Sequence, residues 1–248
     1  MMMERDQRVY GLHACMAVWA HRPDAVRRIF LTDDAAPLFG DVMRALASSR
    51  RPYRVVDDEE MQRASGTRHH EGVCFITDPL PEGDTGQIME DLAASDGPAR
   101  MLFLDRVDNP HNLGAVLRSA AHFGVTAIAG HADEMPVPQG AVARVAEGGA
   151  EVVPTLRWNR PQKGFNALRD RGFACVATVV RGGKDLYAID LPPRCIFLLG
   201  AERDGLGPSA LRVADVAVRI PGVGGVESLN VASASAVLLA EHFRRHPA

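Results

Sequence analysis

The sequence predicts an α/β fold built on a parallel sheet, and three observations support this. Beyond residue 99, short apolar runs typical of buried strands alternate with stretches that are apolar at helical spacing. Strands that alternate with helices form parallel sheets covered by helices on both faces. Several of the apolar runs end in glycine-containing or polar turns, where α/β proteins build ligand sites. The predicted site therefore lies at the carboxyl ends of these strands.

Length and composition restrict the class of protein. The chain has 248 residues, enough for one large domain or two modest ones, and 46% of them are hydrophobic, which excludes a disordered chain. A net charge of −3 excludes a polycation, so contact with nucleic acid requires a local basic patch. The polar start lacks the apolar core expected of a signal peptide, and no apolar run reaches the roughly 18 residues of a membrane span.

The four cysteines, Cys15, Cys74, Cys175 and Cys195, are scattered and form no C-x-x-C pair. This pattern predicts reduced, mostly buried thiols of a cytosolic protein and no structural zinc site.

The first part of the chain, residues 8–78, is predicted to be a small α/β domain. The expected elements are a helix at 11–20, a strand at 27–31, a helix at 38–48, a strand at 52–56, a short helix capped by Asp57 or Asp58, and a strand at 72–76. The polar loop 65–71 carries Arg68, His69 and His70. No third metal ligand lies nearby in sequence, so a solvated loop and an RNA-contacting loop remain the alternatives.

Residues 80–98 are rich in proline and glycine and are predicted to connect two domains, with a short helix at 88–93. A strand at 101–104 follows. Pro110 is expected to open a helix with an apolar stripe, and Gly124 is expected to end it. The remaining expected elements are strands at 125–129, 174–180, 196–199 and 216–220, an extended segment at 151–154, and helices at 142–149, 162–171 and 231–244.

Several nucleotide-binding and hydrolase motifs are absent from this second part. It has no G-x-G-x-x-G fingerprint, no G-x-x-x-x-G-K-[ST] loop and no G-x-S-x-G elbow. A small-molecule nucleotide-binding enzyme is therefore disfavoured. The glycine turns at Gly200 and at 222–225 remain, and their backbone groups can approach and hydrogen-bond a flat ligand. Tight structural turns are an equal alternative.

Three ordered motifs resemble those of the SpoU/TrmH family of RNA 2′-O-ribose methyltransferases. Residues 109–120 resemble the first motif, 199–202 with Gly205-Leu206 the second, and 220–222 through 228–234 the third. Residues 9–73 are similar to the small substrate-binding domain, related to ribosomal protein L30e, that often precedes this catalytic domain, although Glu71 stands where many members have Gln. The resemblance implies an L30e-like RNA-binding domain at 1–79, a linker at 80–98 and a methyltransferase domain at 99–248.

The resemblance implies a C-terminal trefoil knot, a homodimer, S-adenosylmethionine as cofactor and tRNA or rRNA as partner, with no metal and no membrane. Backbone groups of Gly200, Ile220 and Leu229 should contact the cofactor, with Thr178 a further candidate. The residues that the resemblance places around the methyl acceptor or in its support are Arg118, Asn112, Glu202, Ser228 and Asn230.

The resemblance gives the proton-handling role to Arg118. A guanidinium rarely gives up its proton, so we expect Arg118 to bind the target phosphate and polarise the 2′-oxygen. Asn112 should order Arg118 or the first-motif turn, and Glu202 should hold backbone N–H groups or Arg118.

Structural alternatives remain for each residue. Asn112 can be a helix-start residue, Glu202 a cap, Ser228 the N-cap of the last helix and Arg118 a surface residue. His111 is expected to be structural or solvated. The alternative function is a non-catalytic RNA-binding module that keeps the fold, against which the intact polar motif residues argue.

Overall fold

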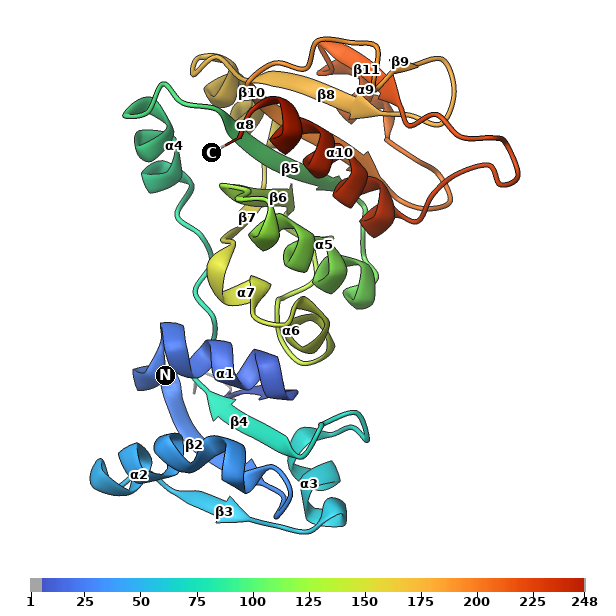
Figure 1. The fold of residues 1–248 in the computed structure, drawn as a ribbon. Coiled ribbons are helices and arrows are strands. Elements are labelled where there is room, and N and C mark those ends of the chain that lie inside the picture. The colour runs from blue at the N-terminus through green and yellow to red at the C-terminus, as the bar shows by residue number, and fades with distance from the viewer. Residues whose placement is uncertain (1–5, 248) are drawn as a thin grey trace. The chain divides into compact units, whose positions relative to one another are not determined.

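The computed structural model describes residues 6–247, and the chain forms two compact units. The first holds the residues up to Pro81 together with Val137–Val152, and the second holds Glu82–Pro136 and the residues from Val153 onward. The chain therefore passes from one unit to the other at residues 81–82, 136–137 and 152–153. Figure 1 shows the course of the chain by colour.

The first unit is built on a four-stranded mixed sheet with the order β1-β4-β2-β3. Its strands are β1 (Gln7–Tyr10), β2 (Val26–Leu31), β3 (Tyr53–Val55) and β4 (Val73–Thr77). Strands β2 and β3 are parallel, whereas β4 runs antiparallel to both β1 and β2. Strand β1 was not predicted, because four residues at the sheet edge carry too short a pattern to distinguish a strand from a loop.

Helices cover both faces of this sheet. The core on one face joins apolar residues of α1 (Leu12–His21) and α2 (Gly40–Ser48) to strand residues such as Ile29 and Phe75. On the other face, Met61 of α3 (Asp58–Ser65) packs against Phe30 and Cys74. Asp57 caps α3 by accepting a hydrogen bond from the Glu60 N–H, as the sequence predicts. Two short 3-10 helices, η1 (Pro23–Ala25) and η2 (Ala36–Phe39), complete this part.

The segment 137–152 differs from its prediction of a helix at 142–149 and an extended stretch at 151–154. It forms two short helices, α6 (Ala141–Ala146) and α7 (Gly149–Val152). Glu147 and Gly148 have φ angles of +45° and +97°, which interrupt the helix between them. A side chain at Gly148 would lie 2.9 Å from the Cβ of Ala17, so glycine is also required by packing. The extended backbone begins only at Thr155.

The second unit contains a seven-stranded sheet with the order β7-β6-β5-β10-β8-β11-β9, and every pairing in it is parallel. Its strands are β5 (Ala99–Asp105), β6 (Ala127–His131), β7 (Thr155–Trp158), β8 (Ala174–Thr178), β9 (Lys184–Asp185), β10 (Arg194–Gly200) and β11 (Val216–Arg219). The predicted parallel α/β architecture is confirmed. Strand β9 was not predicted, since two residues carry no periodicity.

Alternate residues of the central strands face two helical layers. Met101 and Phe103 of β5 pack with apolar side chains of α4 (Thr85–Ala93), α8 (Pro161–Arg169) and α9 (Pro208–Arg212). On the opposite face Phe197 of β10 contacts the His242 ring of α10 (Val231–Arg245). Helix α5 (Pro110–His122) lies beside α10, as the green and red helices in Figure 1 show. Pro110 opens α5 and Gly124, with φ of +65°, follows its end, as predicted.

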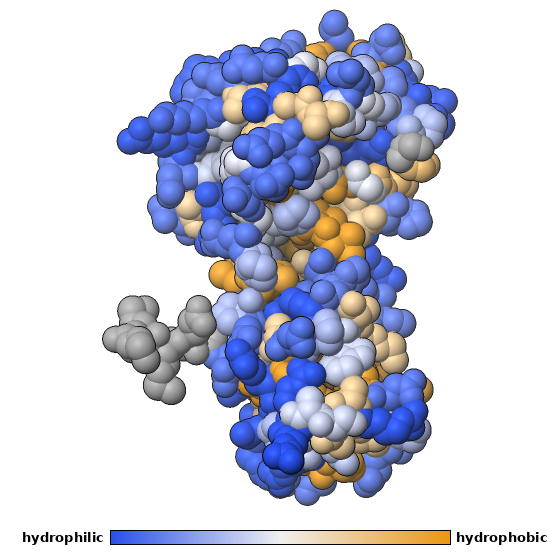
Figure 2. Space-filling view, turned by 90° about the vertical axis from the view of Figure 1, so that its left-hand side faces the viewer, coloured by the Kyte–Doolittle hydropathy of each residue, from blue (hydrophilic) through white to orange (hydrophobic). Residues whose placement is uncertain are grey.

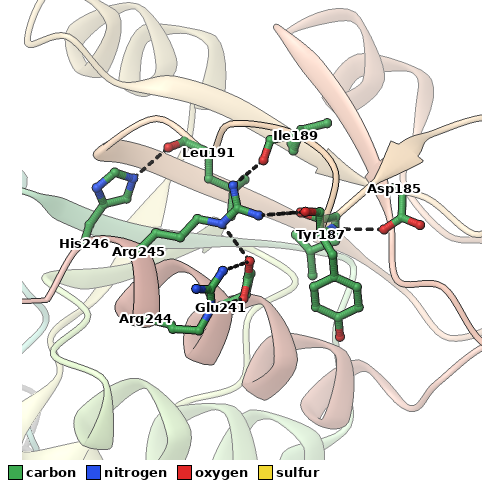
Figure 3. A network of polar contacts seen from close by, with 9 residues as sticks. Asp185, Tyr187, Ile189, Leu191, Glu241, Arg244, Arg245 and His246 are labelled. Atoms are coloured by element: carbon green, nitrogen blue, oxygen red, sulfur yellow. Dashed lines mark hydrogen bonds and ion pairs between the residues drawn. The ribbon is translucent and has the colours of Figure 1, made fainter.

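The carboxyl end of α10 is fixed by a polar network. The Arg245 guanidinium donates to Glu241 Oε1 at 2.6 Å and to the backbone carbonyls of Ile189 and Tyr187 (Figure 3). His246 contacts the Leu191 carbonyl at 2.7 Å. These bonds attach the last turn of the chain to the segment 185–191, which leads into β10.

The surface and the cysteines agree with the composition. Hydrophilic residues cover most of the face drawn in Figure 2.

All four cysteines are buried and free. Burial raises the pKa of Cys175 to about 11 and that of Cys74 to about 12, so neither presents a thiolate near neutral pH. Over residues 6–247, no helix combines the length and the apolar character needed to span a bilayer.

Candidate active site

Three strand ends meet in the middle of the larger sheet. Strands β5 and β10 pair in parallel with Asp105 opposite Gly200, and β8 lies between β10 and β11. The first motif follows β5, the second follows β10, and the third follows β11. Parallel strands present their carboxyl ends at one edge, so segments about 90 residues apart in sequence lie together there.

Asn112, Glu202 and Asn230 form one hydrogen-bonded group, with one residue from each motif. The Asn112 Nδ2 donates to Glu202 Oε1 at 3.0 Å, and the Asn230 Nδ2 donates to the same oxygen at 2.5 Å. The Asn230 Nδ2 also donates to Asn112 Oδ1 at 3.0 Å. The carboxylate therefore holds two side-chain amides, where backbone N–H groups or Arg118 were expected.

Asn230 has a second function as the N-cap of α10. Its Oδ1 accepts hydrogen bonds from the N–H groups of Ala232 at 2.9 Å and Ser233 at 3.4 Å. The alternative that Ser228 caps this helix is therefore wrong. The cap fixes the amide of Asn230, so the start of α10 and the carboxylate of Glu202 are positioned by the same side chain.

A cavity of about 420 Å³ opens beside this group. All four residues predicted to contact the cofactor, Thr178, Gly200, Ile220 and Leu229, line it, and so do Glu202 and Ser228. Apolar side chains such as Leu199 and Leu211 line it together with acidic and basic side chains, among them Glu227 and its ion-pair partner Arg181. Apolar surface suits an adenine ring, and the polar side chains can orient a ligand.

The Thr178 hydroxyl gives independent support for a ligand here. Its Oγ1 is buried and has no hydrogen-bond partner among the described residues. Buried hydroxyls normally find a partner, so an unpaired one in the wall of a cavity is consistent with a bound group that supplies the bond. The residues present therefore fit a nucleoside carrying both hydroxyl and amino groups.

A second cavity, of about 430 Å³, adjoins the first. The segment 201–204 and Val231 line both cavities, and Asn112 and Arg106 line only the second. The hydrogen-bonded group of Asn112, Glu202 and Asn230 thus lies between a cofactor-sized cavity and a more polar one.

The glycines of the two turns have different structural causes. A Cβ on Gly200 would lie 2.1 Å from the carbonyl carbon of Gly205, so the chain can fold back over β10 only at glycine. Gly222 and Gly225 have open space around them, and Gly224 has a φ of +84°. Close packing therefore explains Gly200, whereas only Gly224 of the later turn is required by backbone conformation.

Arg118 lies on α5, the helix that also carries Asn112. Its side chain is exposed and lines neither cavity. His111 is also exposed, and its backbone N–H donates to Oδ1 of the N-cap Asn109 at 2.9 Å.

Two neighbouring residues in this region were not predicted. Asp105, at the end of β5, is 2% exposed and accepts a hydrogen bond from the Gly207 N–H at 2.6 Å. Arg106 follows with a φ of +60° and donates to the Gly205 carbonyl at 3.0 Å. The sequence signal that could have identified Asp105 is an acid at the end of an apolar run, because a buried carboxylate needs nearby hydrogen-bond donors.

One group of potential metal ligands occurs among the described residues. Asp105, His131 and Glu134 place potential ligand atoms within 4.8 Å of one another. Asp105 is already bound by Gly207 and by His131 at 3.2 Å, so its charge has partners without a metal. In the first unit, the buried His70 places its Nε2 3.3 Å from Asp58 Oδ1, whereas His69 is exposed.

Two family models match consecutive parts of the chain. A family model described as the SpoU rRNA Methylase family matches residues 99–240. A second model, described as RNA 2′-O ribose methyltransferase substrate binding, matches residues 8–83.

Two relatives align over nearly the whole chain. The chain is 37% identical over 243 residues to the uncharacterized tRNA/rRNA methyltransferase YfiF of Escherichia coli O157:H7, which covers 98% of this chain and 69% of that protein. It is 33% identical over 245 residues to the 23S rRNA (guanosine-2′-O-)-methyltransferase RlmB of Pseudomonas aeruginosa, which covers 98% of each.

Solved structures share the fold. The SpoU methyltransferase AviRb from Streptomyces viridochromogenes, in complex with AdoMet (S-adenosylmethionine), matches with a TM-score of 0.77 and 21% identity over 97% of this chain and 90% of that one. An AdoMet-bound rRNA methyltransferase from Sinorhizobium meliloti matches with a TM-score of 0.73 and 24% identity over 97% and 88%.

Proposed function

The chain belongs to the SpoU rRNA Methylase family and is an S-adenosylmethionine-dependent RNA ribose 2′-O-methyltransferase, and we propose that its acceptor is a guanosine of 23S rRNA. The proposed acceptor is supported by several RlmB relatives that bear that activity in their names and align end to end with this chain. The E. coli relative, named for tRNA or rRNA, leaves tRNA as the competing acceptor.

The observation that carries the site assignment is that the second and third motifs line one cavity, beside a hydrogen-bonded group that joins all three motifs. We propose that Thr178, Gly200, Ile220 and Leu229 hold the cofactor in the 420 Å³ cavity that they line. The unpaired Thr178 hydroxyl supports this assignment, because a ribose or amino group can satisfy it.

The cofactor supplies both the activated methyl group and its leaving group, so the chain's residues must position the acceptor and manage its proton. We propose that the acceptor ribose binds against the rigid hydrogen-bonded group of Asn112, Glu202 and Asn230. Their three mutual hydrogen bonds fix each side chain before substrate arrives. Ser228, exposed at the cavity mouth, is proposed to contact the ribose directly.

Arg118 is proposed to act on the RNA backbone and the 2′-oxygen. A guanidinium holds its proton, so it stabilises the developing alkoxide and binds the adjacent phosphate more readily than it removes a proton. Arg118 lines neither cavity and is exposed on α5, which suits contact with a large RNA.

We further propose that the chain acts as a homodimer and that residues 1–79 bind RNA. Exposed apolar side chains between β11 and α10, among them Val223, Val226 and Leu229, support a protein interface at this segment. The substrate-binding family match supports the role of the first domain. The trefoil knot implied by the resemblance also remains a proposal.

The test combines methyl transfer in vitro with nucleoside analysis. The purified full chain is incubated with methyl-labelled S-adenosylmethionine and, separately, unmodified 23S rRNA, 16S rRNA and tRNA. The expected result is 2′-O-methylguanosine in 23S rRNA only. Labelled tRNA would replace the proposed acceptor, and no transfer to any RNA together with tight RNA binding would favour a non-catalytic module.

A further inference from the structure

Residues of the segment 201–207 line both cavities. It follows β10, lines the cofactor cavity from Ala201 to Leu206, and contributes Glu202 to the hydrogen-bonded group. It is a tight turn, in which the Gly205 N–H donates to the Ala201 carbonyl at 2.9 Å. The close approach of Gly205 to Gly200 leaves it little room to shift inward.

Asp105 holds the far end of this segment. Its Oδ2 accepts the Gly207 N–H at 2.6 Å, and its Oδ1 faces the His131 Nε2 at 3.2 Å. The carboxylate is buried at the end of the central strand β5, so it is a fixed point in the fold. A hydrogen bond from a backbone N–H to a buried carboxylate is among the stronger ones in proteins.

Arg106 holds the same segment two residues earlier. Its guanidinium donates to the Gly205 carbonyl at 3.0 Å and lies 3.7 Å from the Asp204 carboxylate. Its backbone adopts a φ of +60°, a conformation that is unfavourable for any residue with a side chain. Such strain persists only where the surrounding contacts maintain it, and it often marks a functional position.

We propose that Asp105 and Arg106 form a two-residue clamp that positions the segment 201–207 for cofactor binding. The proposal rests on the proposed placement of S-adenosylmethionine in the 420 Å³ cavity. The clamp joins the first motif's strand to the second motif's turn, so the walls of the cavity are already in place before the cofactor enters. Both are positioning residues, because neither lines the cofactor cavity itself.

The test uses the full chain and replaces one of the two clamp residues at a time. Asp105→Ala deletes the acceptor for Gly207, and Arg106→Gly deletes the guanidinium while relieving the positive φ. Asp133→Ala and Arg160→Ala are charge-matched controls, since each removes an acid or an arginine of the same unit that is exposed and lies outside the two cavities. Hydrogen exchange of residues 201–207 is measured in the free protein, and S-adenosylmethionine affinity by calorimetry.

Each clamp variant should accelerate exchange across residues 201–207 about tenfold and raise the Kd for S-adenosylmethionine about tenfold, the scale of one charge-assisted hydrogen bond. The controls should change neither. Arg106→Lys, which keeps a donor, should recover part of the affinity. At saturating cofactor, kcat should fall less than the Kd rises.

Unchanged exchange and a Kd within twofold of the parent in folded Arg106→Gly would overturn the clamp. So would a lowered Tm with unchanged Kd, since that describes a merely structural contact. If Asp105→Ala does not fold, Arg106→Gly still tests the proposal, because the Arg106 side chain is only half-buried. A parent chain that methylates no RNA would contradict the proposed function alone, because exchange in the free protein tests the clamp independently.

Discussion

At the scale of single residues, Glu202 shows how an exposed acid can matter more for function than for stability. It accepts two amide hydrogen bonds, and its side chain remains exposed to solvent. Exposed charged contacts contribute little to folding because water competes for them. Their effect on side-chain orientation is greater, because removal of the carboxylate leaves both asparagines without their shared hydrogen-bond acceptor.

Glu202→Ala should therefore lower methyl transfer about 10- to 100-fold while changing the free energy of unfolding by less than about 1 kcal/mol. Single-turnover methylation and urea denaturation measure the two effects. Glu90→Ala, which removes an exposed acid on α4, should change neither. A loss of stability large enough to account for the lost activity would contradict this interpretation.

Arg118→Ala should keep the fold and the affinity for S-adenosylmethionine but lose roughly 100-fold or more in turnover, the scale of one catalytic group. The separation is expected because Arg118 lies outside the cofactor cavity. Turnover is measured under saturating cofactor, with calorimetry for binding. Unchanged turnover would remove Arg118 from the mechanism, and Arg118→Lys tests whether the planar guanidinium is needed.

At the scale of elements, α10 joins the site to the core. Asn230 both caps the helix and bonds to Asn112 and Glu202, so one side chain has a structural and a positioning role. Two substitutions separate these roles, because aspartate can cap a helix but cannot donate an amide hydrogen bond.

Asn230→Ala should lower the free energy of unfolding by about 1 kcal/mol, the usual value of an N-cap. Asn230→Asp should stay within about 0.5 kcal/mol of the parent, since a carboxylate at a helix start is favourable and offsets its repulsion of Glu202. Both variants should lose methyl transfer. An active Asp variant would show that only the cap matters.

The same helix carries a pH-sensitive residue, His242. Burial, with the nearby Arg100 charge, lowers the pKa of His242 from 6.5 to about 4, and its Nε2 lies 3.0 Å from the Pro192 carbonyl. The folded state therefore binds a proton less readily than the unfolded state. The stabilising contribution is complete above pH 6.5 and is lost as the pH falls toward 4.

Between pH 7 and pH 4.5 the parent should lose about 2 kcal/mol more unfolding free energy than His242→Gln, after a discount for solvent screening. Urea denaturation at a series of pH values measures the difference. Equal losses in both proteins would assign the acid sensitivity to other groups.

At the scale of the whole molecule, the two units are not continuous in sequence. The segment 137–152 lies within the span of the methylase family match but packs with the first unit. Ala143 joins the core of that unit, and the Gly140 N–H donates to the Arg8 carbonyl at 3.1 Å. The first unit therefore completes its core with residues that come much later in the chain.

A partly buried ion pair strengthens this attachment. Arg22 Nε lies 2.6 Å from Glu151 Oε2, with side chains 15% and 6% exposed. A double-mutant cycle should give a coupling energy of about 2 kcal/mol, because both charges are largely removed from water. The more exposed Arg27–Asp78 pair, at 60% and 37%, is the control and should give less than about 1 kcal/mol. Equal coupling in the two pairs would contradict the role of burial.

The sequence determined the parts of this protein that depend on local pattern. Apolar runs and helical stripes predicted the parallel sheet, and Pro110 and Gly124 predicted the limits of α5. The ordered motifs predicted the family and the four residues that line the cofactor cavity together with Ser228, because each motif is a contiguous stretch that can be recognised without a fold. The roles of those residues remain predictions.

Only the tertiary structure decided which distant residues meet. The partners of Glu202 and the contacts of Asp105 join segments far apart along the chain. The placement of 137–152 depends likewise on packing against α1 and β1. These hydrogen bonds and core contacts depend on where the strands end in space. Periodicity describes only neighbours along the chain, so it does not predict which distant residues meet.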